Sequence, residues 1–358
     1  MRIGVDARSL SGPITGIGRY TMELLNRITL DSEHEWFIYS SLPLLNGNWS
    51  NPNVVVRNWN VSNRLLRMGW YQTILPLWVA IDKCDLFWSP ASYLPYFLPK
   101  SINTVVTIHD LVWKHAPETM RPLSRVLDSW LMPKAVKVSS MIIADSQWTA
   151  NDLSCEIPEA LSKTIVIYLG SSLTKLAATP VDNNTKQSYL LFVGTLEPRK
   201  NLPRLFEAYS RISLELQEKF PLKVVGGSGW GDEMEIPDGV EVMGYVTDVE
   251  LDKLYREASL LLMPSLYEGF GLPIVEAMSR GVPVLTSSIS SMPEIAAEAA
   301  IYVDPYRVES IMIGLNKILS SPTLRSALSK QGLQRSAMFS WDKAAKQTLK
   351  VFESTIQQ

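Results

Sequence analysis

The strongest chemical pattern in the chain is a pair of carboxylates, Glu268 and Glu276, on either side of a turn with two glycines. A helix is predicted to start near Pro273, because proline fits the first helical position, where its missing N–H costs nothing. Amides at a helix N-terminus attract anions, so the backbone of Gly271 and Leu272 is a candidate binding site for phosphate or hydroxyl groups. The alternative interpretation is a plain tight turn with both glutamates in solvent.

A second pattern places two cations, Arg199 and Lys200, shortly after an apolar run at Leu190–Val193. Both this run and Leu260–Met263, which precedes Glu268, are predicted to be buried parallel strands. Ligands bind open parallel sheets at the carboxyl ends of the strands. Cations at that edge can clamp a diphosphate and stabilise its developing charge. The alternative is an ordinary solvated pair of basic residues.

Two further candidates lie in the N-terminal half. His109 and Asp110 end a predicted strand, and the alternative interpretation is that His109 has only a structural role. A glycine-rich loop follows the first strand and contains Gly16 and Gly18, which permit close backbone approach to a phosphate or sugar. A dinucleotide fingerprint would need a third glycine where the chain has Thr21, so the loop alone is weak evidence.

The elements that must position these residues alternate between short β-branched runs and helical periodicity, which predicts an α/β fold with parallel sheets. The first helix should pack on a sheet through Tyr20, Leu24 and Ile28, with Glu23 and Arg27 pointing away. Predicted strands of the first half are Arg2–Asp6, Trp36–Ser40, Val54–Arg57, Asp85–Trp88, Thr104–His109, Met141–Ala144 and Ile165–Tyr168. Those of the second half are Leu190–Val193, Lys223–Val225, Val240–Met243, Leu260–Met263, Val284–Thr286 and Ile301–Val303.

A chain of 358 residues is longer than one hydrophobic core usually supports, so two domains are expected. We expect an N-terminal domain over 1–172, joined by a C-terminal helix at about 341–358, and a second domain over 189–340. The polar, proline-containing segment 173–188 is the predicted linker.

Composition excludes several classes of function. A net charge of −2, with 20% charged residues, does not favour nucleic acid as a partner. Cys84 and Cys155 are the only cysteines and have no metal-like spacing, which favours a reducing, cytoplasmic setting. No apolar run has the length of a membrane span, and no signal-type segment opens the chain.

Four landmarks occur in order: the glycine-rich loop, His109-Asp110, the segment from Gly194 to Asn201, and the Glu268 to Met278 turn. Together they resemble the retaining glycosyltransferases of family 4, and the resemblance covers nearly the whole chain. It implies the GT-B architecture, in which two Rossmann-like, doubly wound domains face each other across a cleft that holds a nucleotide sugar. The overall start and the Glu197–Asn201 segment look like bacterial enzymes that extend surface polysaccharides.

The resemblance implies a role for each candidate residue. Glu268 and the amides of Phe270, Gly271 and Leu272 would hold hydroxyls of the donor sugar, and Glu276 the ribose diol. His109 would contact the donor sugar at its reacting face, and Lys200 the diphosphate. Many relatives carry a basic residue where this chain has Thr195, so either Thr195 or Arg199 is left to complete the diphosphate contact. Residues that would line the base are Gly244, Tyr245 and Val246.

The resemblance also implies a same-face displacement, in which the departing diphosphate helps deprotonate the acceptor hydroxyl and no protein nucleophile is needed. The chain has no Asp-x-Asp pair in the setting that chelates a metal diphosphate, so we expect no metal and no other cofactor. Spacing alone does not make Glu268 and Glu276 a hydrolase-type acid and nucleophile.

The first choice of reaction is transfer of α-mannose from GDP-mannose to a lipid-linked or growing polysaccharide acceptor of the O-antigen or capsule type. A basic and aromatic stretch from Arg57 to Trp78, with Arg64, Arg67 and Trp70, is a candidate surface for anionic lipid at the cytoplasmic face of the inner membrane. Alternatives are another donor (UDP-glucose, GDP-fucose or dTDP-rhamnose), a GT-B nucleotide-sugar epimerase, or a non-catalytic sugar-binding protein.

Overall fold

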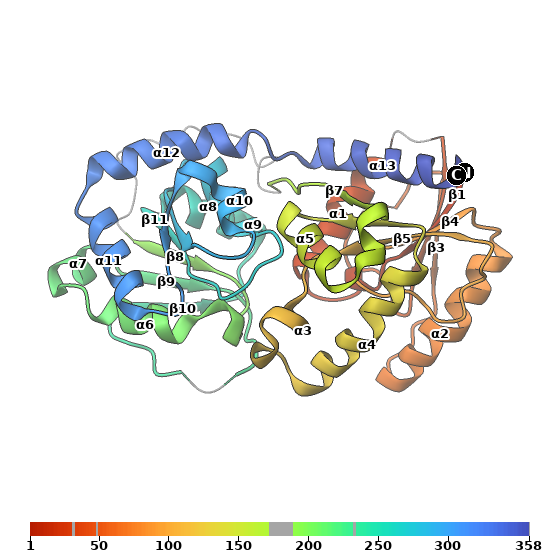
Figure 1. The fold of residues 1–358 in the computed structure, drawn as a ribbon, viewed down its shortest axis with the longest axis horizontal. Helices are drawn as coiled ribbons and strands as arrows, with labels where there is room; N and C mark the ends of the chain where they lie inside the picture. The colour runs from red at the N-terminus through yellow and green to blue at the C-terminus, as the bar shows by residue number, and fades with distance from the viewer. Residues whose placement is uncertain (31–32, 48, 172–188, 232–233, 358) are drawn as a thin grey trace. The chain divides into compact units, whose positions relative to one another are not determined.

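The computed structural model describes residues 1–30, 33–47, 49–171, 189–231 and 234–357 of the chain, so the predicted linker 173–188 lies outside the described residues. Two compact units divide the chain. Unit 1 comprises Met1–Leu111, Val126–Leu169 and Ser340–Gln358, and unit 2 comprises Val112–Arg125 and Gly170–Phe339. Figure 1 draws each unit as a sheet flanked by helices.

The sheet of unit 1 has seven strands in the order β3-β2-β1-β4-β5-β6-β7, and every neighbouring pair is parallel. This confirms the predicted parallel sheet, with strand ends shifted by one or two residues. The order reverses between β1 and β4, which makes their carboxyl ends the topological switch point of this sheet. The strands are β1 (Arg2–Asp6), β2 (Glu35–Ser40), β3 (Val54–Asn58), β4 (Leu86–Ser89), β5 (Asn103–Ile108), β6 (Met141–Ala144) and β7 (Thr164–Val166).

Helices cover this sheet and connect its strands. The α-helices are α1 (Gly16–Ile28), α2 (Arg64–Ile81), α4 (Pro122–Val138), α5 (Gln147–Glu156) and α13 (Trp341–Gln357), with α4 beginning in the segment assigned to unit 2. Short 3-10 turns are η1 (Arg8–Leu10) and η3 (Pro158–Lys163). Helix α1 buries Tyr20, Leu24 and Ile28 as predicted.

Glu23 and Arg27, which were predicted to point away from the sheet, contact another helix rather than solvent. Glu23 is buried, and Arg27 donates from Nε to Asp342 Oδ1 at 2.6 Å. The reason is long-range, since α13 from the end of the chain packs on α1 and covers the face that the local pattern left polar.

The sheet of unit 2 has six parallel strands in the order β10-β9-β8-β11-β12-β13, so its switch point lies between β8 and β11. The strands are β8 (Leu190–Val193), β9 (Leu222–Val225), β10 (Val240–Gly244), β11 (Leu260–Met263), β12 (Val284–Ser287) and β13 (Ala300–Val303). The helices are α3 (Val112–His115), α6 (Leu202–Ser210), α7 (Leu214–Lys219), α8 (Asp248–Glu257), α9 (Leu272–Ser279), α10 (Met292–Ala296), α11 (Val308–Leu319) and α12 (Pro322–Ser336), with turns η2 (Pro117–Thr119), η6 (Pro198–Lys200) and η7 (Ala297–Ala299).

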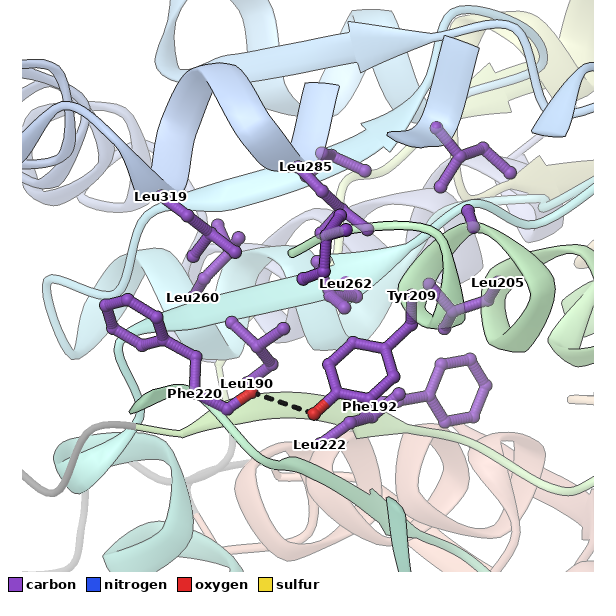
Figure 2. Packing of buried hydrophobic residues seen from close by; sticks show 14 of the residues in the cluster. Leu190, Phe192, Leu205, Tyr209, Phe220, Leu222, Leu260, Leu262, Leu285 and Leu319 are labelled. Atoms are coloured by element: carbon purple, nitrogen blue, oxygen red, sulfur yellow. Dashed lines mark hydrogen bonds between the residues drawn. The ribbon is translucent and has the colours of Figure 1, made fainter. Parts of the chain in front are cut away.

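The core of unit 2 forms where the strand leucines meet α6 and α11. Figure 2 shows Tyr209 of α6 among these side chains, with its hydroxyl donating to the backbone oxygen of Phe220 at 3.2 Å. A buried tyrosine is stable here because its polar end has an acceptor. The labelled apolar members are Leu190, Phe192, Leu205, Phe220, Leu222, Leu260, Leu262, Leu285 and Leu319.

One segment of the N-terminal half belongs to unit 2, which differs from the single domain expected over 1–172. Val112 and Ala116 form a small buried cluster with Tyr267, and the His115 ring stacks on the Tyr267 ring at 5.5 Å. This packing ties the segment to the loop that follows β11.

Candidate active site

The switch point of unit 2 brings the two strongest sequence motifs together. Strands β8 and β11 are adjacent and parallel, so the loops that follow them leave the sheet at the same edge. The loop after β8 carries Arg199 and Lys200, and the loop after β11 carries Glu268. Residues 68 positions apart in the sequence therefore become hydrogen-bonding partners.

Glu268 lies between the two cations. Lys200 Nζ is 2.7 Å from Oε1 of Glu268, and Arg199 Nη1 is 2.7 Å from Oε2. Arg199 also donates from Nη2 to Glu197 and from Nη1 to the backbone oxygen of Tyr267, each at 2.7 Å. We name Glu197, Arg199, Lys200 and Glu268 the Glu268 network. Lys200 and Glu268 are buried, so they are not the solvated side chains of the alternative interpretation.

Electrostatics keep this carboxylate charged. Burial by itself would raise the pKa of Glu268, but Arg199 and then Lys200 outweigh the burial and lower the pKa to about 2. Hydrogen bonds between oppositely charged partners are shorter and stronger than neutral ones. The network therefore holds both cations in fixed positions at neutral pH.

Lys200 owes its position to the next residue, which the sequence did not indicate. Asn201 has a φ of 62°, in the left-handed region, and forms the junction between η6 and α6. Its side-chain amide donates to the backbone oxygens of Pro264 and Pro305, at 2.9 and 2.7 Å. Asn201 thus links the Lys200 turn to the loop after β11. Asparagine tolerates this backbone region better than most residues.

The glycine turn forms as predicted. Gly271, with a φ of 94°, is the N-cap of α9, and Pro273 lies in the first turn. Two hydrogen bonds fix the backbone at the start of this turn, because the hydroxyls of Ser290 and Ser291 both donate to the backbone oxygen of Glu268. Phe270 is buried, which leaves its backbone rather than its side chain for a ligand.

Glu276 is also buried, inside α9, and accepts a hydrogen bond from the hydroxyl of Tyr255 at 3.0 Å. Tyr255 lies in α8 and was not among the predicted site residues. The proposed base-lining residues begin at the last residue of β10, Gly244, which has a φ of 71°, and continue with Tyr245, which is 63% exposed. These residues are two strands from β8 in the sheet.

The remaining predicted residues of unit 2 take up less enclosed positions. Thr195, in the loop after β8, is exposed, whereas Arg199 is held in the Glu268 network. Leu272 begins α9 and is half-buried, and Val246 is half-buried just before α8. Arg199 is therefore less exposed and more firmly held than Thr195, which makes it the better candidate to contact a diphosphate.

In unit 1, His109 follows β5 and is enclosed at the carboxyl edge. Its Nδ1 is 2.5 Å from Oδ2 of Asp145, and its Nε2 is 2.8 Å from the backbone oxygen of Pro90. Burial favours the neutral ring, but Asp145 and the backbone of Pro90 outweigh it and raise the pKa of His109 to about 8. Both nitrogens face oxygen acceptors, so the doubly protonated ring satisfies both. Asp145 directly follows β6 and was not among the predicted site residues. Its position at the end of a predicted strand would have been enough to select it as a candidate.

One glycine of the glycine-rich loop is required by packing, which sequence reasoning did not identify. Gly16 and Gly18 lie in the first turn of α1, which Thr15 caps by accepting from the Gly18 amide. A Cβ on Gly18 would lie 2.8 Å from the backbone oxygen of Ser9, so only glycine lets α1 approach η1 this closely. Around Gly16 the space is open.

The stretch from Arg57 to Trp78 does not form one surface as predicted. Trp70, Tyr71 and Leu75 are buried in the core of unit 1, and Arg57 pairs with Asp82. The exposed large apolar residues of helix α2 are Leu65, Leu66, Met68, Leu77 and Ile81. Among the helices that the structure describes, none combines the length and the hydropathy needed to cross a membrane.

Comparisons with known proteins agree with this architecture. Residues 178–335 match the family described as glycosyl transferases group 1. The chain is 30% identical over 391 aligned positions to the O-antigen chain mannosyltransferase B of Escherichia coli, covering 99% of this chain and all of that protein. It is 25% identical to the O-antigen chain mannosyltransferase RfbU of Salmonella typhimurium, over 76% of each chain.

Among solved structures, the sucrose-phosphate synthase of Thermosynechococcus elongatus superposes with a TM-score of 0.78 at 18% identity, covering 99% of this chain and 98% of that one. A likeness at that identity concerns the fold, which is two Rossmann-like domains of the GT-B type. With sequence similarity along its whole length and both parallel sheets in place, the chain belongs to the group 1 glycosyltransferases, of the family 4 type with the GT-B fold.

Proposed function

We propose that this glycosyltransferase moves α-mannose from GDP-mannose to a lipid-linked or growing O-antigen-type saccharide, with retention of configuration and without a divalent ion. Full-length similarity to a protein named as an O-antigen chain mannosyltransferase supports the sugar and the acceptor class. The observation that carries the chemistry is the buried Glu268 network at the switch point of unit 2.

In this proposal Lys200 and Arg199 meet the diphosphate of the donor. The leaving group gains negative charge as the glycosidic bond lengthens, and only interactions that strengthen in the transition state raise turnover. Two cations that Glu268 already holds in place need little reorganisation when that charge appears. They would thereby take the role that a metal ion has in other glycosyltransferases.

The two glutamates then have separate tasks. Glu268 would accept a hydrogen bond from a hydroxyl of the donor sugar while it orients the cations. Glu276 would accept from the ribose diol, with Tyr255 fixing its carboxylate. The amides of Gly271 and Leu272, at the start of α9, would donate to the sugar or phosphate oxygens.

The deciding experiment is a donor screen. Thermal unfolding is measured with GDP-, UDP-, ADP- and dTDP-sugars, since a ligand at 100 times its dissociation constant stabilises by about 2.7 kcal/mol. We expect GDP-mannose to give the largest shift and an α-linked product by NMR of the anomeric signal. A larger shift with another donor would refute the choice of mannose, and a β-linked product would refute retention. Epimerised donor without transfer would favour the epimerase alternative.

We also propose that α2 contacts the anionic surface of the membrane that holds the acceptor. The helix contains no Asp or Glu, its exposed residues Leu65, Leu66 and Leu77 are apolar, and Arg64 and Arg67 lie near its start. Apolar side chains beside basic ones suit a peripheral helix at an anionic bilayer. Replacing Arg64 and Arg67 by Ser should lower flotation with phosphatidylglycerol vesicles and leave GDP-mannose binding unchanged. Equal flotation of both proteins would overturn this.

A further inference from the structure

An ion pair that the donor chemistry does not use lies at the switch point of unit 1. Asp6 ends β1, and its carboxylate accepts from Nε and Nη2 of Arg8 at 2.9 and 2.8 Å. The guanidinium lies over the Tyr71 ring, with Cζ 3.4 Å from the ring centroid. The side chain of Asp6 is 3% exposed, whereas that of Arg8 is 31% exposed. A buried carboxylate and an aromatic face thus fix a cation that remains open to solvent.

Arg8 keeps donors to spare in this arrangement. A guanidinium carries five N–H donors, and the bidentate contact with Asp6 uses one edge. Within the described parts of the chain, the hydrogen bonds of the Arg8 side chain run to Asp6 alone, which leaves Nη1. Ligands of open α/β sheets bind outside the carboxyl ends of the strands at the switch point, which is where Asp6 and Arg8 stand.

Tyrosine side chains connect the surroundings of Arg8 to carboxyl groups. Tyr71 donates to the backbone oxygen of Tyr93 at 3.0 Å, and the Tyr93 hydroxyl donates to Asp128. Burial and then the charge of Asp110 raise the pKa of Asp128, so the carboxyl groups of Asp110 and Asp128 lie close together beside Tyr93. A ligand rich in neutral hydroxyl groups can donate to carboxylates and accept from Nη1, whereas these carboxylates disfavour a phosphate.

We propose that Arg8 binds a hydroxyl of a neutral sugar ring in the acceptor, with Tyr93 and Asp128 completing the same subsite. The inference rests on the proposed function in one respect, since it takes the acceptor to be a saccharide. Arg8 is then a specificity-determining residue on the acceptor side, separate from the donor contacts of unit 2.

The chain supplies a matched control for this idea. Arg57 also makes a bidentate contact with a buried carboxylate, that of Asp82, and is 40% exposed. Arg57 lies in β3, which is two strands from β1 in the sheet. Arg8→Ala and Arg57→Ala therefore remove the same kind of ion pair at β1, within the sheet, and at the edge strand β3.

The test is steady-state kinetics with GDP-mannose and octyl α-mannotrioside as the probe acceptor, with donor affinity measured by calorimetry in the absence of acceptor. We expect Arg8→Ala to raise the acceptor KM about tenfold or more and Arg57→Ala to leave it within twofold, with the donor Kd unchanged in both. An equal KM in wild type and Arg8→Ala would overturn the inference while leaving the proposed function intact. If Arg8→Ala does not fold, Arg8→Lys decides in the same way, because lysine lacks the planar fork.

A second arm tests the charge argument and is independent of turnover. Saturation-transfer NMR compares binding of octyl α-mannotrioside with that of mannose 6-phosphate. Stronger binding of the neutral glycoside, lost in Arg8→Ala, supports the subsite. Stronger binding of the phosphate, lost in the same variant, would overturn the neutral-sugar assignment. If no sugar nucleotide gives turnover but the glycoside still binds through Arg8, the proposed function fails and the subsite stands.

Discussion

The Glu268 network of unit 2 and the His109 contacts of unit 1 are opposite solutions to one problem, which is how to bury a charge at a sheet edge. In unit 2 a carboxylate is held by two cations, and its pKa falls to about 2. In unit 1 an imidazole is held by a carboxylate and a carbonyl, and its pKa rises to about 8. The first charge is therefore constant over the working pH range, whereas the second titrates within reach of it. A Glu268 carboxylate that stays charged keeps Arg199 and Lys200 in place, which suits the stabilisation of an anionic leaving group.

The largest effect should be on the free energy of unfolding, when the carboxylate at the centre of the Glu268 network is removed. Glu268→Ala leaves Arg199 and Lys200 without their shared carboxylate, and breaking a buried ion pair by removing one partner costs about 3–5 kcal/mol. Urea unfolding should show this loss in the free energy of unfolding. Glu250→Ala, at an exposed carboxylate of α8, is the control and should change it by much less. A change below about 1 kcal/mol for Glu268→Ala would mean that the network is not held as tightly as its geometry indicates.

Next in size is the effect of Lys200→Ala on turnover. Loss of one preorganised donor at a developing anion costs about 10²-fold in kcat. Arg199→Ala should cost less if Arg199 only assists, and wild-type activity should survive excess EDTA. Activity that EDTA abolishes and Mg²⁺ restores, together with near-normal Lys200→Ala, would show that the cations do not carry the leaving-group charge.

The comparison also predicts opposite pH dependences. The pKa of His109 in the fold lies above its ordinary 6.5, so its contribution is complete below pH 6.5 and is lost as the pH rises through about 8. A shift of this size corresponds to roughly 2 kcal/mol. Unfolding free energies measured from pH 6 to 9 should fall in wild type and stay flatter in His109→Gln. The Glu268 contribution is lost instead as the pH falls from 4.5 toward 2. Parallel curves for wild type and His109→Gln would contradict this assignment.

The smallest effect is expected at Tyr255. Tyr255→Phe removes the hydrogen bond to Glu276 but keeps the packing, at a cost of about 0.5–1.5 kcal/mol in donor affinity. Glu276→Ala should cost more, about 1.5–3 kcal/mol, because it removes the charged acceptor itself. Calorimetry with GDP resolves the two variants. An unchanged affinity in both would remove Glu276 from the nucleotide site.

Sequence reasoning located the strands and placed Lys200 and Glu268 at the carboxyl edge of one sheet, because both predictions follow from simple rules of strand patterning and sheet topology. Apolar β-branched runs mark buried strands, and parallel strands collect their following loops at one edge. Asn201 and Tyr255 could not be found this way. The role of Asn201 depends on a left-handed backbone and on two carbonyl oxygens far along the chain.

Helix α2 shows a second limit. Its sequence is apolar around most of its circumference, so periodicity does not tell the buried face from the exposed one. Tyr71 and Trp70 packed inward, while Leu65 and Leu66 face solvent. Packing against the neighbouring strands and the contact of Tyr71 with Arg8 determine which face of α2 is buried. Only tertiary packing could supply that information.

The packing of α13 has a consequence for the order in which the protein matures during translation. Trp341 and Phe352 of this last helix are buried in unit 1, where Phe352 contacts the rings of Trp36 and Trp88. The sheet of unit 1 is synthesised first, but its core stays incomplete until these aromatic side chains have been made. The segments of unit 2, which end at Phe339, are synthesised before them. Nascent unit 1 must spend most of synthesis with an uncovered α1, so chaperone binding should be concentrated there rather than on the later-made unit.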